Sequence, residues 1–374
     1  SIQAMTKVLC ALHNVFIFLF CFLVTFDAYL SILRNVQSLV NRAIGRDSPV
    51  WRMLHSCPTC NYKNEQPLFP ACLDAIYGNN SLKRIDGSGH ADERVFASSY
   101  LIPPAETSSD VNQNQITSDL SPADIVDSMC TENWKAANTI SENTVSVFNQ
   151  TGVFISACRH GIIQTMVEIS NVRVNSAKYA IATMDKVLDV YGPNSATGYD
   201  IGCSFSTTIA ASSIAKKASD HKHRFVVNSF HGHAHNRACQ LDYHPLYQPG
   251  FGIEDLETCE RIFAGSNAVA PVVRHASYFH WLQFIDLQFN QWDQDHYLEL
   301  SKFLYNNYKQ AIDIIENLAP VVNELKTALG ITDADFVQWN TKEREYLRRL
   351  SKAQMKDVQG AEYVEVLEDL QRAE

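Results

Sequence analysis

The feature that most constrains the fold is a stretch of strand-like and helix-like segments between residues 151 and 230. Three segments are short and rich in β-branched or aromatic residues, which predicts strands: 151–158, 196–203 and 224–230. Three others have apolar residues at helical spacing: 161–169, 177–192 and 205–218. Strands that alternate with helices predict an α/β sheet covered by helices.

The two flanks differ from this central stretch. Residues 1 to about 50 have a helical pattern that GRDSP, residues 45–49, interrupts, and the sequence after Gly252 is almost entirely helical. Residues 103–145 are rich in Ser, Asp, Asn and Pro and predict a long surface connection. We therefore expect three parts: a helical N-terminal segment (1–60), an α/β core (61–280) and a helical C-terminal region (281–374).

One apolar stretch, Val8–Phe26, approaches the length of a membrane span, for which about 20 apolar residues suffice. The helical pattern continues beyond it and admits charges, so a buried helix or helical hairpin is favoured over a membrane anchor. The chain opens at Ser1 rather than at a methionine, which suggests a piece of a longer protein.

Charge and cysteine content limit the environment and the partners. The net charge is −10, from 31 basic and 41 acidic side chains, so the chain as a whole does not favour a polyanion and any nucleic-acid contact must be local. The ten cysteines are irregularly spaced, with one CxxC at Cys57 and Cys60. This favours reduced intracellular thiols over a disulfide framework.

Acidic residues stand at the ends of two predicted strands. Asp74 ends the run LFPACLD and Asp200 ends ATGYD, while Glu260 shares the apolar face of a predicted helix over 252–263. Three carboxylates that meet in this way can hold two Mg²⁺ or Mn²⁺ ions for phosphodiester chemistry. The alternative is that these acids are ordinary, because acids are common at strand ends and in first helical turns.

A set of longer motifs carries a resemblance to a known family. In order, the motifs are CLDAIYGNNSLKRI, NWKAAN, GVFISACRHGII, AKYAIATMDKVLDVYG, GYDIGCSFS, FHGHAHNRACQLDYHPLY and GIEDLETCERIFAGSNAVAPVVRHASYFHW. Together they resemble the KDZ (Kyakuja–Dileera–Zisupton) transposases of fungal mobile elements over residues 50 to 310. The resemblance implies an RNase H-like mixed sheet and DNA cleavage and strand transfer by a DDE-type site with Mg²⁺ or Mn²⁺. It also implies DNA as partner, a nuclear location and no small-molecule substrate, and it is compatible with a homo-oligomer.

The resemblance assigns the catalytic acids to positions of this chain. They are Asp74, Asp200 and Glu260, with Glu257 as the alternative third acid. In the family the first acid directly precedes a Gly-Asn pair, whereas Ala75, Ile76 and Tyr77 separate Asp74 from Gly78 here. Either the turn is longer, or Asp74 is out of register and the site is damaged, with Asp86 as a fallback. A second hypothesis is therefore a catalytically inactive, domesticated relic that binds DNA or chromatin.

Basic residues beside these motifs are candidates for phosphate contacts: Lys83, Arg84, Arg159 and Arg237. Exposed Lys and Arg are most often simply solvated, so each has an ordinary alternative.

The segment 230–245, FHGHAHNRACQLDYHP, concentrates candidate zinc ligands. If the strand over 224–230 continues, His231, His233 and His235 lie on one face. One interpretation is a structural zinc site made of Cys203, His231, His235 and Cys239. The favoured interpretation is a group of neutral histidines hydrogen-bonded around the carboxylates, beside the predicted active site.

Two other pairs remain open. Cys57 and Cys60 form half of a zinc site that would need a distant Cys or His to complete it. Cys158 and His160 suggest a Cys/His nucleophile pair, but no third orienting group is evident, so buried packing is the default.

Overall fold

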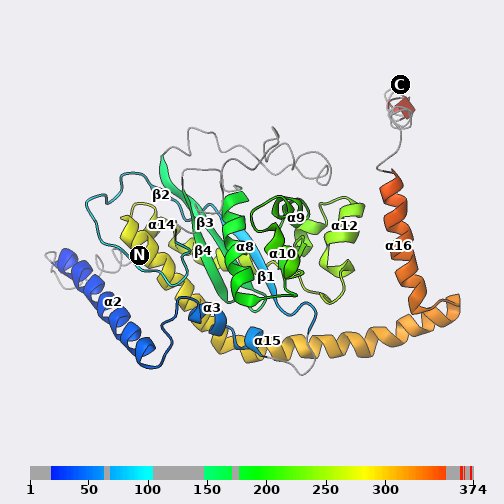
Figure 1. Cartoon of the computed structure of the whole chain (residues 1–374), viewed down its shortest axis with the longest axis horizontal. Helices are drawn as coiled ribbons and strands as arrows, with labels where there is room; N and C mark the ends of the chain where they lie inside the picture. Colours follow the sequence, from blue (N-terminus) through cyan, green and yellow to red (C-terminus); the bar gives the residue numbers. More distant parts are fainter. Residues whose placement is uncertain are drawn as a thin grey trace.

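The computed structural model of the chain describes residues 18–62, 68–103, 147–170 and 177–350, and a few residues between 363 and 372. It is a mixed α/β protein in which one six-stranded sheet carries helices on both faces, and long helices follow toward the C-terminus (Figure 1). The expected α/β class and helical C-terminal region are confirmed.

The sheet combines antiparallel and parallel pairs. Its strands are β1 (Leu73–Asn79), β2 (Arg84–Ile85), β3 (Phe148–Cys158), β4 (Ile163–Ser170), β5 (Ala196–Gly198) and β6 (Arg224–Val226). β3 is antiparallel to β1, β2 and β4. β5 is parallel to both β1 and β6. The carboxyl ends of β1, β5 and β6 therefore meet at one edge of the sheet.

Alternation along β3 separates two hydrophobic cores. Val153, Ile155 and Ala157 pack with helices on one face, whereas Phe154 packs with helices on the other. The first face is covered by α13 (Thr258–Ser266), α14 (Ala270–Val273) and the start of α15 (Tyr278–Leu329). The second is covered by α8 (Ala177–Tyr191), α9 (Gly202–Ala210) and α10 (Ala215–Asp220).

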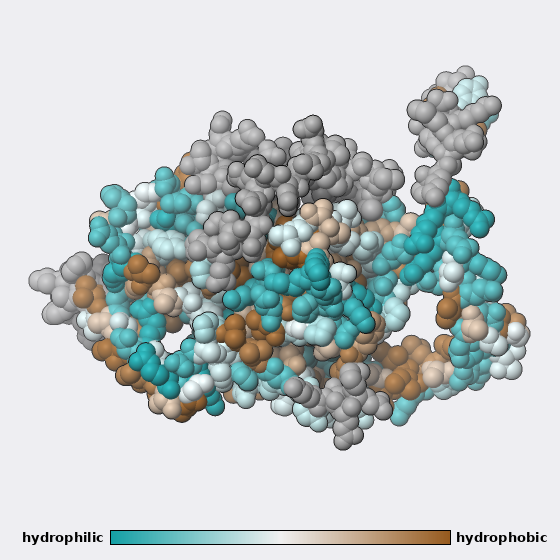
Figure 2. Space-filling view, viewed as in Figure 1, coloured by the Kyte–Doolittle hydropathy of each residue, from teal (hydrophilic) through white to brown (hydrophobic). Residues whose placement is uncertain are grey.

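Other helices surround this centre. They are α2 (Phe18–Ala43), α3 (Trp51–His55), α4 (Pro58–Asn61), α11 (Ser229–Gly232), α12 (Arg237–Tyr243), α16 (Asp333–Leu350) and the short 3₁₀ turns η1 (Pro245–Tyr247) and η2 (Asn267–Val269). The outer half of α15 projects past the sheet (Figure 1), and Figure 2 shows hydrophobic residues gathered there. Leu318 and Leu325 are among its exposed apolar side chains.

Two local predictions near the sheet are wrong. Segment 161–169, predicted as a helix, is mostly strand β4, and Ile163, Met166 and Val167 are all buried. A strand covered on both faces loses the alternation of polar and apolar residues, so its pattern can imitate a helix. The run LFPACLD also does not end in a strand at Asp74, because β1 begins at Leu73 and Asp74 is its second residue.

The strand predicted over 224–230 ends early. β6 stops at Val226, and the next residue donates its backbone N–H to Tyr243 O instead of extending the sheet. The histidine segment then forms the short helices α11 and α12, so its three alternating histidines do not share a strand face. The helix predicted over 252–263 likewise begins only at Thr258.

Some predictions fall outside the described residues. These are the surface connection from residue 104 onward, the NWKAAN motif and most of the apolar stretch Val8–Phe26. Among the helices that the structure describes, none has the length and apolar character needed to cross a membrane.

Candidate functional site

Three of the predicted acids gather at the carboxyl end of β5. Asp200 lies two residues beyond this strand, and its Oδ1 accepts a hydrogen bond of 3.0 Å from the Asn228 amide. His231 Nδ1 lies 3.2 Å from the same oxygen and 3.7 Å from Glu257 Oε1. Glu257 is the N-cap residue of α13, and Glu260 lies in the first turn of that helix.

Tyr77 of β1 lies beside this group. Its phenol interacts with the carboxylates of Asp200 and Glu260, and its ring lies 6.1 Å from the Phe263 ring, centroid to centroid. Burial, together with the charges of the two acids, raises the pKa of Tyr77 well above its usual value. The phenol therefore stays neutral beside the two acids.

The same surroundings shift the protonation of the acids and of the histidine. Burial raises the pKa of Asp200 to about 6, although His231 and Tyr77 act in the opposite direction. Burial also raises the pKa of Glu260. The neighbouring carboxylates of Glu257 and Asp200 raise the pKa of His231 although burial lowers it, which favours an imidazolium among these carboxylates.

Strand register explains why Tyr77 meets Asp200. β1 and β5 pair at Asp74 with Thr197 and at Ala75 with Gly198, so continuing the register by two residues places Tyr77 level with Asp200. Asp74 lies three residues earlier, about 10 Å back along the strand, and its side chain points to the opposite face.

Asp74 belongs to a separate buried polar group. It is fully buried, its Oδ2 accepts a 2.6 Å hydrogen bond from the Thr197 hydroxyl, and its Oδ1 has no hydrogen-bond partner. Thr197 Oγ1 also lies 2.9 Å from His223 Nε2. Burial raises the pKa of Asp74 to about 7 and lowers that of His223 to about 3. The fallback acid, Asp86, directly follows β2 and donates its backbone N–H to Val147 O.

Cysteine and histidine side chains form two further groups that can hold a metal such as zinc. Among the described residues these are the groups whose donor atoms all lie within 4.8 Å of one another, and neither includes a carboxylate. One contains Cys203, His235 and Cys239, all buried, with His235 Nδ1 at 3.6 Å and 3.3 Å from the two sulfurs. Three of the four predicted zinc ligands are thus together, while His231 lies beside Asp200. The second group is Cys57, Cys60, Cys158 and His160.

The predicted phosphate contacts are mostly engaged inside the chain. Arg84 is buried and donates to Gln150 Oε1 and Ser88 O. Arg159 pairs with Glu254 at 2.6 Å, and Arg237 pairs with Glu343 at 2.7 Å. The Lys83 ammonium lies 5.2 Å from the centre of the Phe148 ring.

The prediction from sequence missed Tyr77 and the partners of Asp74. The signal for Tyr77 was present, because this residue directly precedes Gly78 and Asn79, where the resembling family has its first acid. The roles of Thr197 and His223 had no such signal, since they depend on strand register.

Comparison with known proteins gives one match. A family model described as Kyakuja-Dileera-Zisupton transposase matches residues 70–293. Searches of curated proteins and of solved structures found no match.

Proposed function

Because the chain belongs to the Kyakuja–Dileera–Zisupton transposase family, we propose that it is a DNA-associated, catalytically silent descendant of a DDE-type transposase. In this proposal the chain keeps the catalytic scaffold and has lost the first of its three metal-binding acids. The tyrosine between Asp200 and Glu260 is the observation that carries the proposal.

The strand arrangement supports an RNase H-like scaffold. Three antiparallel strands, β1, β3 and β4, continue into two parallel ones, β5 and β6, as in that fold. The acids of α13 approach the ends of β1 and β5 from one face. This is where a DDE-type site would place its carboxylates.

The residues at this place do not fit a complete two-metal site. When bound, Mg²⁺ or Mn²⁺ ions would activate an attacking hydroxyl and stabilise the leaving oxygen. Such ions prefer carboxylate oxygens, and a neutral phenol does not replace the missing charge. Tyr77 and His231 instead place a neutral phenol and a positive charge beside Asp200 and Glu260.

Restoring an acid at position 77 tests the proposal directly. The wild-type chain is expected not to nick supercoiled plasmid in Mn²⁺ and to bind Mn²⁺ weakly. Tyr77→Asp places a third carboxylate beside the other two, so Mn²⁺ affinity should rise at least about tenfold, a change of roughly 1.4 kcal/mol. Calorimetry measures the binding, and plasmid nicking reports whether cleavage returns.

Two variants control this experiment. Tyr77→Asn has the size of the aspartate without its charge and should leave Mn²⁺ binding weak. Asp200→Asn, added to Tyr77→Asp, should remove the gain. Mn²⁺-dependent nicking by the wild-type chain that disappears in Asp74→Asn would contradict the proposal and would instead support an intact site built on Asp74.

Family membership also leads us to propose DNA as the partner, a mobile element as the origin and the nucleus as the location. These proposals rest on the family, not on a measured contact. Nuclear exclusion of the tagged full chain in its host cells would argue against them.

A further inference from the structure

We infer that Cys57, Cys60, Cys158 and His160 form a structural zinc site that fastens the segment before the sheet to the turn between β3 and β4. The four side chains come from two regions of the chain about a hundred residues apart: Cys60 and His160 are separated by 100 positions. This inference is independent of the proposed loss of cleavage.

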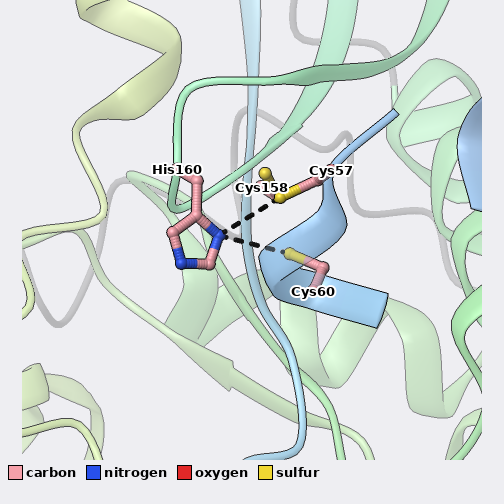
Figure 3. Close-up of side chains that lie close together, drawn as sticks. All are labelled: Cys57, Cys60, Cys158 and His160. Atoms are coloured by element: carbon pink, nitrogen blue, oxygen red, sulfur yellow. Dashed lines mark hydrogen bonds between the residues drawn. The ribbon is translucent and has the colours of Figure 1, made fainter. Parts of the chain in front are cut away.

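The donor atoms have the spacing of a tetrahedral site. Figure 3 shows His160 Nδ1 directed at two sulfurs, at 3.5 Å from Cys57 Sγ and 3.3 Å from Cys60 Sγ, with Cys158 Sγ beside them. All four donor atoms lie within 4.8 Å of one another. Zinc bonds of about 2.3 Å to sulfur and 2.0 Å to nitrogen, at tetrahedral angles, would separate nitrogen from sulfur by about 3.5 Å.

Hydrogen bonding alone does not explain this arrangement. A histidine Nδ1 carries either one hydrogen or one lone pair, so it cannot make good hydrogen bonds to two thiols at once. Cys57, Cys158 and His160 are buried, where unmatched polar groups are costly. One ion with four ligands satisfies all of these groups together.

The local backbone prepares each pair of ligands. Cys57 is the N-cap of the short helix α4, and Pro58 begins that helix, so Cys60 returns to the same side one turn later. Cys158 ends β3, and the turn after it is closed by a 2.9 Å hydrogen bond from Gly161 N to Cys158 O. Trp292 of α15 donates to Gly161 O at 2.8 Å, which fixes the turn from the other side.

The site would act through the chain connection that it closes. Cross-linking α4 to the β3–β4 turn restricts a loop of about 100 residues in the unfolded chain. It would also hold α3 and α4 against the end of β3 that pairs with Asp74 in β1. We expect the ion to be structural, because four protein ligands leave no open position for water or substrate.

Zinc content of the full chain tests the site. After gel filtration with a weak chelator, Cys60→Ser and Cys158→Ser should each hold one zinc per chain less than wild type. Cys72→Ser is the matched control, because Cys72 is another thiol near Cys60 that lies outside the group of four. It should keep the wild-type zinc content.

A ligand exchange keeps the test decisive if a serine variant fails to fold. His160→Cys preserves four ligands and should retain the metal, while His160→Phe should lose it. With Co²⁺ in place of zinc, the thiolate charge-transfer absorption should increase in His160→Cys. Equal zinc in wild type, Cys158→Ser and His160→Phe would overturn the inference, as would a metal-free wild type with a disulfide among Cys57, Cys60 and Cys158.

Discussion

At the scale of single residues, Asp74 and Tyr77 show that position within a strand matters more than residue type. Both lie in β1, yet Asp74 accepts a hydrogen bond from Thr197, which also contacts a histidine, whereas Tyr77 lies beside two acids. A carboxylate is useful to a metal only if it points to the place where the other carboxylates meet. Three residues of displacement reverse the face and move the side chain by about 10 Å.

Asp74 should make stability depend on pH. Its folded pKa of about 7 is above the value of about 3.9 expected in the unfolded chain, so the folded state binds the proton more tightly. Its contribution to stability is present below pH 4 and is lost as pH rises toward 7. Asp74→Asn removes this loss. The difference in free energy of unfolding between Asp74→Asn and wild type should therefore change in favour of the variant, on the order of 2 to 4 kcal/mol, as pH rises from 4.5 to 8.

Urea unfolding at both pH values measures this difference. Thr197→Val keeps the volume and removes the hydroxyl donor to Asp74, so it should lower stability and raise the pKa of Asp74 further. A difference between wild type and Asp74→Asn that stays constant across the pH range would show that Asp74 does not titrate as expected.

At the scale of elements, the α12 cap organises the group of Cys203, His235 and Cys239. The Asn236 side chain accepts a 2.9 Å hydrogen bond from the backbone N–H of Cys239, which fixes the first turn of α12. Asn236→Ala should lower the free energy of unfolding by about 1 kcal/mol, whereas Asn236→Asp keeps the acceptor and should cost little. Chemical denaturation distinguishes them, and equal losses in both variants would show that capping is not the cause.

The sequence allowed some elements to be predicted but not others, for a physical reason. Helix α8 was predictable because one side of it faces the core, and its apolar residues recur with the helical period. Strand β4 was not, because its residues are buried from both faces.

The same contrast holds for the site. The acid after β5 and the acid on α13 could be chosen from motifs, but the register that aligns Tyr77 with Asp200 could not be predicted from the sequence. Cys57 with Cys60, and Cys158 with His160, were visible as pairs, while their meeting required the fold.

At the scale of the whole molecule, charge limits how this chain can meet DNA. The net charge is −10, and Arg159 and Arg237, two of the predicted phosphate contacts, pair with acids of the chain. When the logarithm of the binding constant is plotted against the logarithm of the salt concentration, each phosphate that the protein neutralises makes the slope more negative by about 0.9. Of the four predicted contacts, Arg84 is buried as well, so the predicted set offers few cations to phosphates. We therefore expect weak binding with a slope no steeper than about −2.

Fluorescence anisotropy with a labelled duplex at several salt concentrations measures that slope. Lys83→Ala should bring the slope closer to zero by roughly 1, because its ammonium lies over an aromatic ring and forms no ion pair with the acids that the structure describes. Arg237→Ala should leave the slope unchanged. It removes the contact with Tyr247 and the ion pair between α12 and α16, which is worth at most about 1 kcal/mol because the Arg237–Glu343 pair is partly exposed. A wild-type slope near −6 that becomes less steep in Arg237→Ala would contradict this expectation. It would mean that Arg237 leaves Glu343 to bind phosphate and that the scaffold rearranges when it binds DNA.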